Sequence, residues 1–184
     1  MRIDRRRSQL MIIDVQEKLA PHIEGGAAAA ANCGRLIRYA RRLGVPITIT
    51  EQYPKGLGPT VPALREAAGN EVPCLEKIAF SCWRDEVIRN RIEMLTTDGR
   101  DQIVIGGMET HVCVGQTVLD LLAASRNVFL VADAVGSREA RVRDLALERY
   151  RQDGARIVAQ EMVGFEWLDR GDDPAFKDLI AIIK

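Results

Sequence analysis

The sequence predicts an α/β protein built on a parallel sheet of about six strands with helices on both faces. Two observations predict this class. Short apolar segments alternate with longer helical segments about six times along the 184 residues, and strands separated by helices pair in parallel. The first apolar segment is continuously apolar from 10 to 13, as expected of a strand that is buried on both faces.

The elements follow from periodicity and stop signals. The first strand is predicted at 8–15, and a helix follows at 27–43, where Leu36 and Tyr39 share one stripe and Gly44 ends the helix. Further strands are expected at 47–50, 72–76, 102–106, 128–132 and 155–159. Further helices are expected at 85–95, 112–124 and 138–152. A turn-rich segment at 51–59 has the length of an active-site loop.

Length and composition fit one globular domain spanning 1–184, with 47% hydrophobic and 28% charged residues. The 26 basic and 26 acidic side chains cancel, which gives no electrostatic reason to expect a nucleic-acid partner. The basic run 5–7 is interpreted as a solvated lead-in to the first strand. No segment reaches the ~18 apolar residues of a membrane span, and no secretory signal is recognisable. We therefore expect a cytoplasmic protein without a membrane partner.

The four cysteines have no tight metal-binding spacing, and in a reducing compartment we expect free thiols rather than disulfides. They are Cys33, Cys74, Cys82 and Cys113.

The residues that follow the strands predict an active site at one edge of the sheet. In open parallel sheets, ligands bind beyond the carboxyl ends of the strands, near the point where the winding direction reverses. Asp14 follows the first strand, with Gln16 two positions on, and Lys77 follows the third. After the fourth strand, the glycine-rich turn 106–113 brings Cys113 to the start of a helix.

These residue types together suit acyl transfer. A helix N-terminus and a nearby ammonium both favour a thiolate, so we expect the pKa of Cys113 to lie below its ordinary value of about 8.5. Lys77 supplies the ammonium, while Asp14 can take the thiol proton and later activate water. Backbone N–H groups of the turn 107–113 can bind the oxyanion. Each residue alone has a simpler explanation: a turn residue, a surface charge or a small buried side chain. Their shared edge of the sheet favours the catalytic interpretation.

Three segments resemble the signature segments of the isochorismatase-like cysteine hydrolases. They are IIDVQ at 12–16, KIAFS at 77–81 and GGMETHVCV at 106–114. The pair Asp133-Ala134 is also typical of the family. The loop TEQYPKGLGPT at 50–60 and the tail PAFKDL at 174–179 resemble the isochorismatase domain-containing protein subgroup, whose physiological substrate is generally unassigned.

The resemblance implies a three-layer Rossmann-like fold with strand order 3-2-1-4-5-6. It also implies that Asp14, Lys77 and Cys113 form the catalytic triad. A cis peptide bond is implied at Met108–Glu109, with the N–H groups of Glu109 and Cys113 forming the oxyanion hole. Members of the family are commonly dimers or larger assemblies, so a homo-oligomer is expected.

The sequence departs from the metal-binding nicotinamidases of the family, which carry an Asp-x-His pair and a further His after the second strand. Here the segment 51–54 is EQYP, and the two histidines are His22 and His111. A zinc site needs three or four ligands, so we expect neither a metal nor another cofactor. His111 is expected to be held by the turn rather than to act as a base.

The leading hypothesis is a metal-independent hydrolase that cleaves a small-molecule amide, or a related acyl compound, through a thioester on Cys113. Candidate pocket residues are Gln16, Tyr53, Phe80, Trp83 and His111. For Phe80 and Trp83, core packing is an equally good explanation. Arg138 is expected to have a structural role rather than to bind a substrate anion. Two alternatives remain open: a nicotinamidase-type enzyme with an altered metal site, and a scaffold protein that keeps the fold without turnover.

Overall fold

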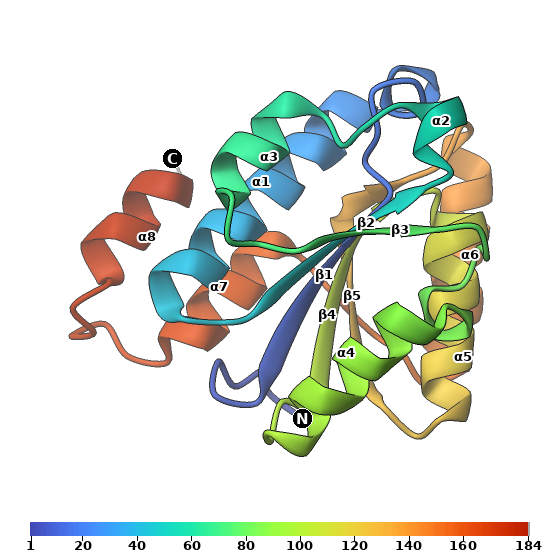
Figure 1. Ribbon diagram of the computed structural model, residues 1–184. Helices are drawn as coiled ribbons and strands as arrows, with labels where there is room; N and C mark the ends of the chain where they lie inside the picture. The colour runs from blue at the N-terminus through green and yellow to red at the C-terminus, as the bar shows by residue number, and fades with distance from the viewer. Residues whose placement is uncertain (184) are drawn as a thin grey trace.

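Six parallel strands form one sheet in the order β3-β2-β1-β4-β5-β6. The computed structural model describes residues 1–183, and Figure 1 shows helices on both sides of this sheet. The strands are β1 (Ser8–Ile13), β2 (Ile47–Gln52), β3 (Cys74–Lys77), β4 (Gln102–Met108), β5 (Asn127–Gly136) and β6 (Arg156–Val158). The predicted fold class and strand order are confirmed.

The winding direction reverses at β1. This strand pairs with β2 on one side and with β4 on the other, and Ile13 lies opposite Gly107 in the second pairing. The carboxyl ends of β1 and β4 are therefore neighbours, which places the segments that follow them at the switch point of the sheet.

Eight α-helices occur within residues 1–183. They are α1 (Gly26–Leu43), α2 (Pro54–Leu57), α3 (Pro62–Ala68), α4 (Glu86–Thr97), α5 (Gly115–Ala123), α6 (Ala140–Gln152), α7 (Gln160–Leu168) and α8 (Phe176–Ile183). Short helical turns lie at Ala20–His22, Cys82–Arg84 and, with π-helical geometry, Thr110–Val114.

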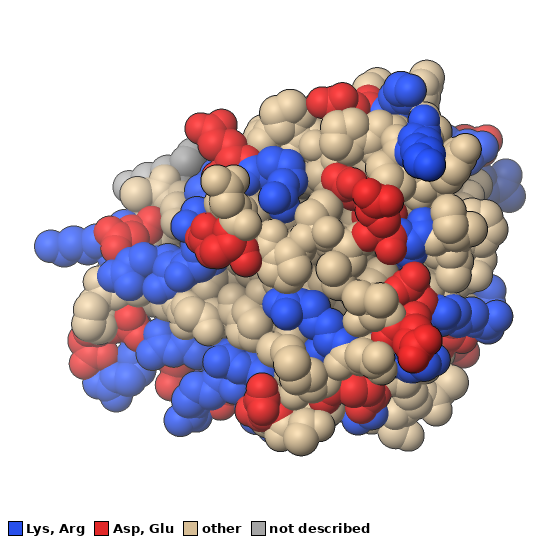
Figure 2. Space-filling model, viewed as in Figure 1, with Lys and Arg blue, Asp and Glu red and all other residues tan. Residues whose placement is uncertain are grey.

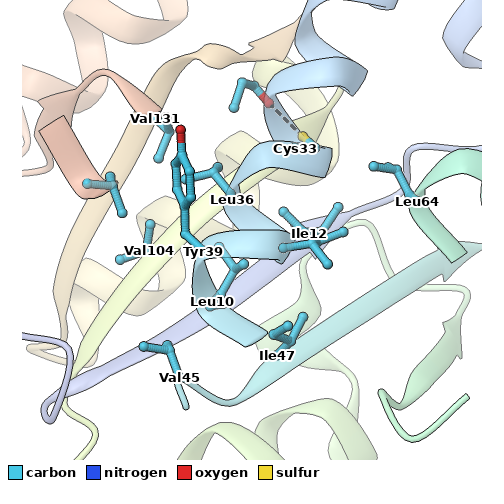
Figure 3. Close-up of a cluster of buried hydrophobic side chains, with 14 of the residues drawn as sticks. Leu10, Ile12, Cys33, Leu36, Tyr39, Val45, Ile47, Leu64, Val104 and Val131 are labelled. Carbon is cyan, nitrogen blue, oxygen red and sulfur yellow. Dashed lines mark hydrogen bonds between the residues drawn. The ribbon is translucent and has the colours of Figure 1, made fainter. Parts of the chain in front are cut away.

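Alternate residues of each strand face opposite layers, so β1 contributes to two cores. Leu10 and Ile12 pack in the core beneath α1, α3, α7 and α8, and Met11 and Ile13 pack in the core beneath α4, α5 and α6. Figure 3 shows part of the first core, where Tyr39 of α1 lies among these apolar side chains.

Several predicted boundaries were wrong for local reasons. The first strand ends at Ile13 rather than 15, because Asp14 adopts a left-handed backbone conformation with φ of 53°. The fifth strand continues to Gly136, so Asp133-Ala134 lies within it and not after it. The helix expected at 112–124 begins at Gly115, behind the π-helical turn.

Three longer helices, α3, α7 and α8, were not predicted. The apolar residues of α7 lie on more than one side of the helix, including both Val163 and Trp167 in the core and Phe165 at the surface, so no clear stripe marks it in the sequence.

Charges of both signs are interleaved on the face drawn in Figure 2. Many of them form surface ion pairs, such as Arg84 with Asp120 and Arg41 with Glu71. All four cysteines are free thiols, as expected. Within residues 1–183, no helix combines the length and the apolar character that crossing a membrane requires.

Candidate active site

Asp14, Lys77 and Cys113 converge at the carboxyl edge of the sheet. Asp14 directly follows β1, Lys77 is the last residue of β3, and Cys113 lies in the π-helical turn between β4 and α5. The side chains of Asp14 and Lys77 are 0% exposed, and Cys113 is 5% exposed. The three groups thus share a nearly water-free environment, in which charges interact more strongly than in water.

Asp14 and Lys77 form a buried ion pair. The Lys77 Nζ donates to Asp14 Oδ2 at 2.6 Å, to Gln52 Oε1 at 2.9 Å and to the carbonyl oxygen of Phe80 at 3.1 Å. Thr50 Oγ1 donates to Asp14 Oδ1 at 2.7 Å. Burial alone would lower the pKa of Lys77, but the charge of the Asp14 carboxylate and its hydrogen bond outweigh burial and raise that pKa. The lysine is therefore a charged, fixed ammonium.

The Cys113 thiol is not the depressed-pKa thiolate that the sequence suggested. Burial raises its pKa above the ordinary value, and the negative charge of Asp14 raises it further, against the opposing effect of Lys77. The expectation of a lowered pKa was wrong because burial and the carboxylate outweigh the ammonium. The arrangement is a neutral thiol beside a carboxylate that can accept its proton.

The turn before Cys113 begins with a close backbone approach. Gly107 has φ of 133°, and a Cβ on this residue would lie 2.0 Å from the carbonyl oxygen of Ile13, so only glycine fits here. The peptide bond between Met108 and Glu109 is cis. The Glu109 carbonyl accepts from the Val114 N–H at 3.2 Å, whereas no residue between 1 and 183 accepts a hydrogen bond from the Glu109 N–H. That N–H is a free donor at the turn.

The side chain of Glu109 is held by Arg138. Arg138 donates to Glu109 Oε2 from its backbone N and from Nε, both at 3.1 Å, and to Oε1 from Nη2 at 2.7 Å. Burial would raise the pKa of Glu109, but these bonds and the guanidinium charge lower it overall. His111 lies 3.0 Å from Ser137 by its Nδ1 and Oγ atoms. The side chains of Arg138 and His111 thus both bind to other residues of the protein.

Gln16 holds the neighbouring loop, 53–59, in place. Its Nε2 donates to the carbonyl oxygens of Gln52 at 3.0 Å and Gly58 at 2.6 Å, and its Oε1 accepts from the Gln52 N–H at 2.8 Å. At the far end, Glu51 Oε1 accepts from the N–H and the hydroxyl of Thr60 at 2.6 and 2.7 Å. Gln16 is fully buried, and its amide is committed to these contacts.

The remaining predicted pocket residues lie in different surroundings. Tyr53 and Phe80 are each 51% exposed, whereas Trp83 is half-buried against the core beneath α4 to α6. The Arg126 guanidinium lies 5.8 Å from the centre of the Trp83 ring. A cavity of about 380 Å³ opens beside the loop 53–59. It is lined by Tyr53, Pro54, Lys55, Glu76, Lys77, Ile78, Ala79 and Asp85.

Sequence reasoning missed several residues around the three groups. Thr50 and Gln52 contact Asp14 and Lys77, and their period-2 spacing on β2 could have indicated that they share a face. Cys82 is fully buried, with its sulfur 3.8 Å from Thr50 Oγ1, and burial raises its pKa to about 11. Its position beside Asp14 and Lys77 has no signal in the sequence.

Within residues 1–183, no group of three or more His, Cys, Asp or Glu side chains is arranged to hold a metal ion. His22 lies exposed at the end of the turn Ala20–His22.

Known proteins resemble the chain over nearly its full length. The isochorismatase domain model matches residues 8–162, a range that contains Asp14, Lys77 and Cys113. Isochorismatase family protein 1B of Dictyostelium discoideum is 37% identical over 179 residues, which cover 96% of this chain and 86% of that protein.

Two solved structures are also similar. The MAR1 ribonuclease of Caenorhabditis elegans has a TM-score of 0.92 and 36% identity, covering 100% of this chain and 92% of its own. YcaC from Pseudomonas aeruginosa, determined with hexane-2,5-diol and covalent acrylamide, has a TM-score of 0.88 and 26% identity, covering 98% of this chain and 91% of its own.

Proposed function

The chain belongs to the isochorismatase domain family of hydrolases, and from that premise we propose that it hydrolyses a small-molecule amide, or a related acyl compound, through a thioester on Cys113. One observation carries the proposal: the side chains of Asp14, Lys77 and Cys113 come together in one buried site, in which the Asp14 carboxylate lies 2.6 Å from the Lys77 ammonium.

The first half-reaction forms the thioester. Asp14 takes the thiol proton, and the Cys113 sulfur attacks the substrate carbonyl carbon as the carbonyl π electrons move onto oxygen. The free N–H of Glu109, together with the Cys113 N–H, donates to that oxyanion. The intermediate collapses, the C–N bond breaks, and the leaving amine takes its proton from Asp14.

The second half-reaction uses water. Asp14, again a carboxylate, removes a proton from a water molecule that attacks the thioester carbonyl, and the C–S bond breaks to release a carboxylic acid and the Cys113 thiol. Lys77 remains a cation throughout. It holds the carboxylate in place and stabilises the thiolate during attack, which offsets the raised pKa of the resting thiol.

A similar protein supports a reactive nucleophile in this fold. YcaC from P. aeruginosa carries a covalent acrylamide, and acrylamide is itself a small primary amide. By analogy, we propose that the substrate is a small carboxamide.

The proposal is tested with a generic acyl donor, because the natural substrate is unidentified. Purified protein mixed with p-nitrophenyl acetate should release p-nitrophenol in a burst and carry a transient acetyl group on Cys113, detected by peptide mass spectrometry. Cys113→Ala should abolish both signals. Cys33→Ala is the matched control, because Cys33 lies in the core on the other face of the sheet and should react as wild type. Burst kinetics that survive in Cys113→Ala would contradict the proposal. Ammonia release from a panel of primary carboxamides then identifies the substrate.

A second candidate is RNA cleavage, favoured by the similarity to the C. elegans MAR1 ribonuclease. The balanced charge of the chain and the interleaved charges of Figure 2 favour the first candidate, since nucleic-acid binding depends on phosphate neutralisation. Release of labelled fragments from single-stranded RNA by wild type, but not by Asp14→Asn, would establish the second.

Nicotinamide turnover that depends on added zinc would favour the nicotinamidase-type alternative, and complete inertness toward acyl donors and RNA would favour the scaffold. We further propose a homo-oligomer, which sedimentation velocity tests directly.

A further inference from the structure

Glu109 places a negatively charged side chain in the same turn whose N–H groups are proposed to stabilise the negatively charged oxyanion. Its N–H is a free donor of the proposed oxyanion hole, while its own carboxylate is 6% exposed. Two like charges in a buried site repel strongly. An unpaired Glu109 carboxylate would therefore oppose formation of the oxyanion.

Arg138 cancels that charge. The guanidinium binds both carboxylate oxygens, through Nε at 3.1 Å and Nη2 at 2.7 Å, and the Arg138 backbone N–H adds a third bond at 3.1 Å. This fork geometry is the one in which arginine pairs most effectively with a carboxylate. It also ties the end of β5 to the turn that follows β4.

We propose that Arg138 is a positioning residue for acyl transfer, which acts through Glu109 by neutralising its carboxylate beside the proposed oxyanion hole. The inference rests on the proposed function. The inference extends the proposed function by assigning a role in the reaction to Arg138, an exposed arginine that does not touch the thiol.

The groups around this pair define the pH behaviour. Arg138 and His111 face Glu109, and Glu139 faces Arg138. Without the guanidinium, burial is the main remaining influence on Glu109 and raises its pKa. The carboxylate then protonates as the pH falls, and the repulsion disappears.

A purely structural role makes a different prediction. If Arg138 only fastens the turn, its loss is not corrected by removing the charge of Glu109, because two neutral amides do not restore a bidentate ion pair. If charge cancellation matters, Glu109→Gln rescues Arg138→Gln.

The experiment compares two reactions of the same thiol. Acylation of Cys113 by p-nitrophenyl acetate passes through an oxyanion, whereas alkylation by iodoacetamide is a direct displacement without one. The ratio of the two rates cancels any change in the thiolate fraction of Cys113, so it isolates stabilisation of the oxyanion. Both rates are read at Cys113 by peptide mass spectrometry on folded protein, from pH 5 to 8.

In Arg138→Gln the ratio should fall by about tenfold at pH 7.5, less than the ~100- to 1,000-fold loss that follows removal of an oxyanion donor. It should recover toward wild type as the pH falls. Arg138→Lys, which keeps the charge, and Glu109→Gln/Arg138→Gln should both lie within about threefold of wild type, and the double variant should show no recovery with acidification beyond that of wild type. This last result excludes protonation of His111 as the source of the recovery.

Two results would overturn the inference alone: an unchanged ratio in Arg138→Gln, or a double variant as impaired as the single one. If Arg138→Gln does not fold, Glu109→Gln is compared with the double variant, and a further loss on removing Arg138 counts against charge cancellation. Wild-type protein that is alkylated but never acylated at Cys113 would overturn the proposed function, and this inference with it.

Discussion

Replacing Lys77 with methionine tests the energetics of the buried ion pair most directly. Methionine keeps much of the length of lysine and removes its charge. The substitution leaves the Asp14 carboxylate buried without a cation. It also removes the donor bound to Gln52 Oε1 at 2.9 Å and to the Phe80 carbonyl at 3.1 Å.

The expected loss is large because both side chains are 0% exposed. Removing one member of a buried pair typically costs about 3–5 kcal/mol, since the remaining charge is left uncompensated. The two orphaned acceptors act in the same direction. Small domains have a free energy of unfolding of about 5–15 kcal/mol, so Lys77→Met should lose at least about a fifth of it.

The assay is urea unfolding at pH 7, followed by circular dichroism. The matched control is Arg170→Met, which breaks an ion pair of the same length, 2.6 Å, whose side chains are 72% and 69% exposed. That change should leave the free energy of unfolding nearly unchanged, because solvent screens an exposed pair. The double variant Asp14→Asn/Lys77→Met removes both charges and should be more stable than Lys77→Met alone.

Equal losses in Lys77→Met and Arg170→Met would refute the reasoning, because burial would then have no effect on the cost. A double variant less stable than Lys77→Met would refute it as well, since the uncompensated carboxylate would not be the source of the loss.

Asp14→Asn should lower the pKa of Cys113, because the carboxylate raises it; the midpoint of iodoacetamide alkylation against pH should move down, and an upward shift would contradict the assignment. Gly107→Ala should cost at least about 3 kcal/mol in urea unfolding, because its Cβ would meet backbone at 2.0 Å. Gly99→Ala, at φ of 88° with nothing within 4 Å, is the control and should cost only about 1–2 kcal/mol. Asp85→Ala removes the N-cap of α4, whose Oδ1 accepts two backbone N–H groups, and should lower the free energy of unfolding by about 1 kcal/mol; no change would show that solvent replaces the cap.

The architecture was largely predictable because buried parallel strands are nearly continuous apolar runs. Strands β1 and β4 have that character, and the resemblance to a known family supplied the strand order. Helices such as α7 were missed because an element that contacts its neighbours on several sides has no single apolar stripe. The end of β1 depends on the left-handed backbone of Asp14; aspartate is enriched in this conformation, but the preference is too weak to mark the end of a strand in the sequence.

The convergence of three candidate residues was predictable, but their neighbours on β2 and the electrostatics of the candidate site were not. Topology alone brings Asp14, Lys77 and Cys113 to one edge, because the carboxyl ends of parallel strands meet there. The direction of the pKa shift of Cys113 depends on burial and on the distance to a carboxylate, which are three-dimensional quantities. Likewise, Glu109 and Arg138 are 29 residues apart in sequence, and nothing local indicates their pairing.

The loop 53–59 has a consequence for how this protein would discriminate between molecules. The Gln16 side chain bonds to the backbone of Gln52 before the loop and of Gly58 near its end, and Glu51 accepts from the N–H of Thr60 just after it. Loops that close over a ligand belong to the least stable parts of a fold. The loop 53–59 differs from them, because these hydrogen bonds hold it in place. Under the proposed function, the loop is a fixed wall of the cavity that Tyr53, Pro54 and Lys55 line. We then expect candidate molecules to be selected by exclusion at a preformed entrance, and a change of specificity to require new side chains on this wall rather than a new motion.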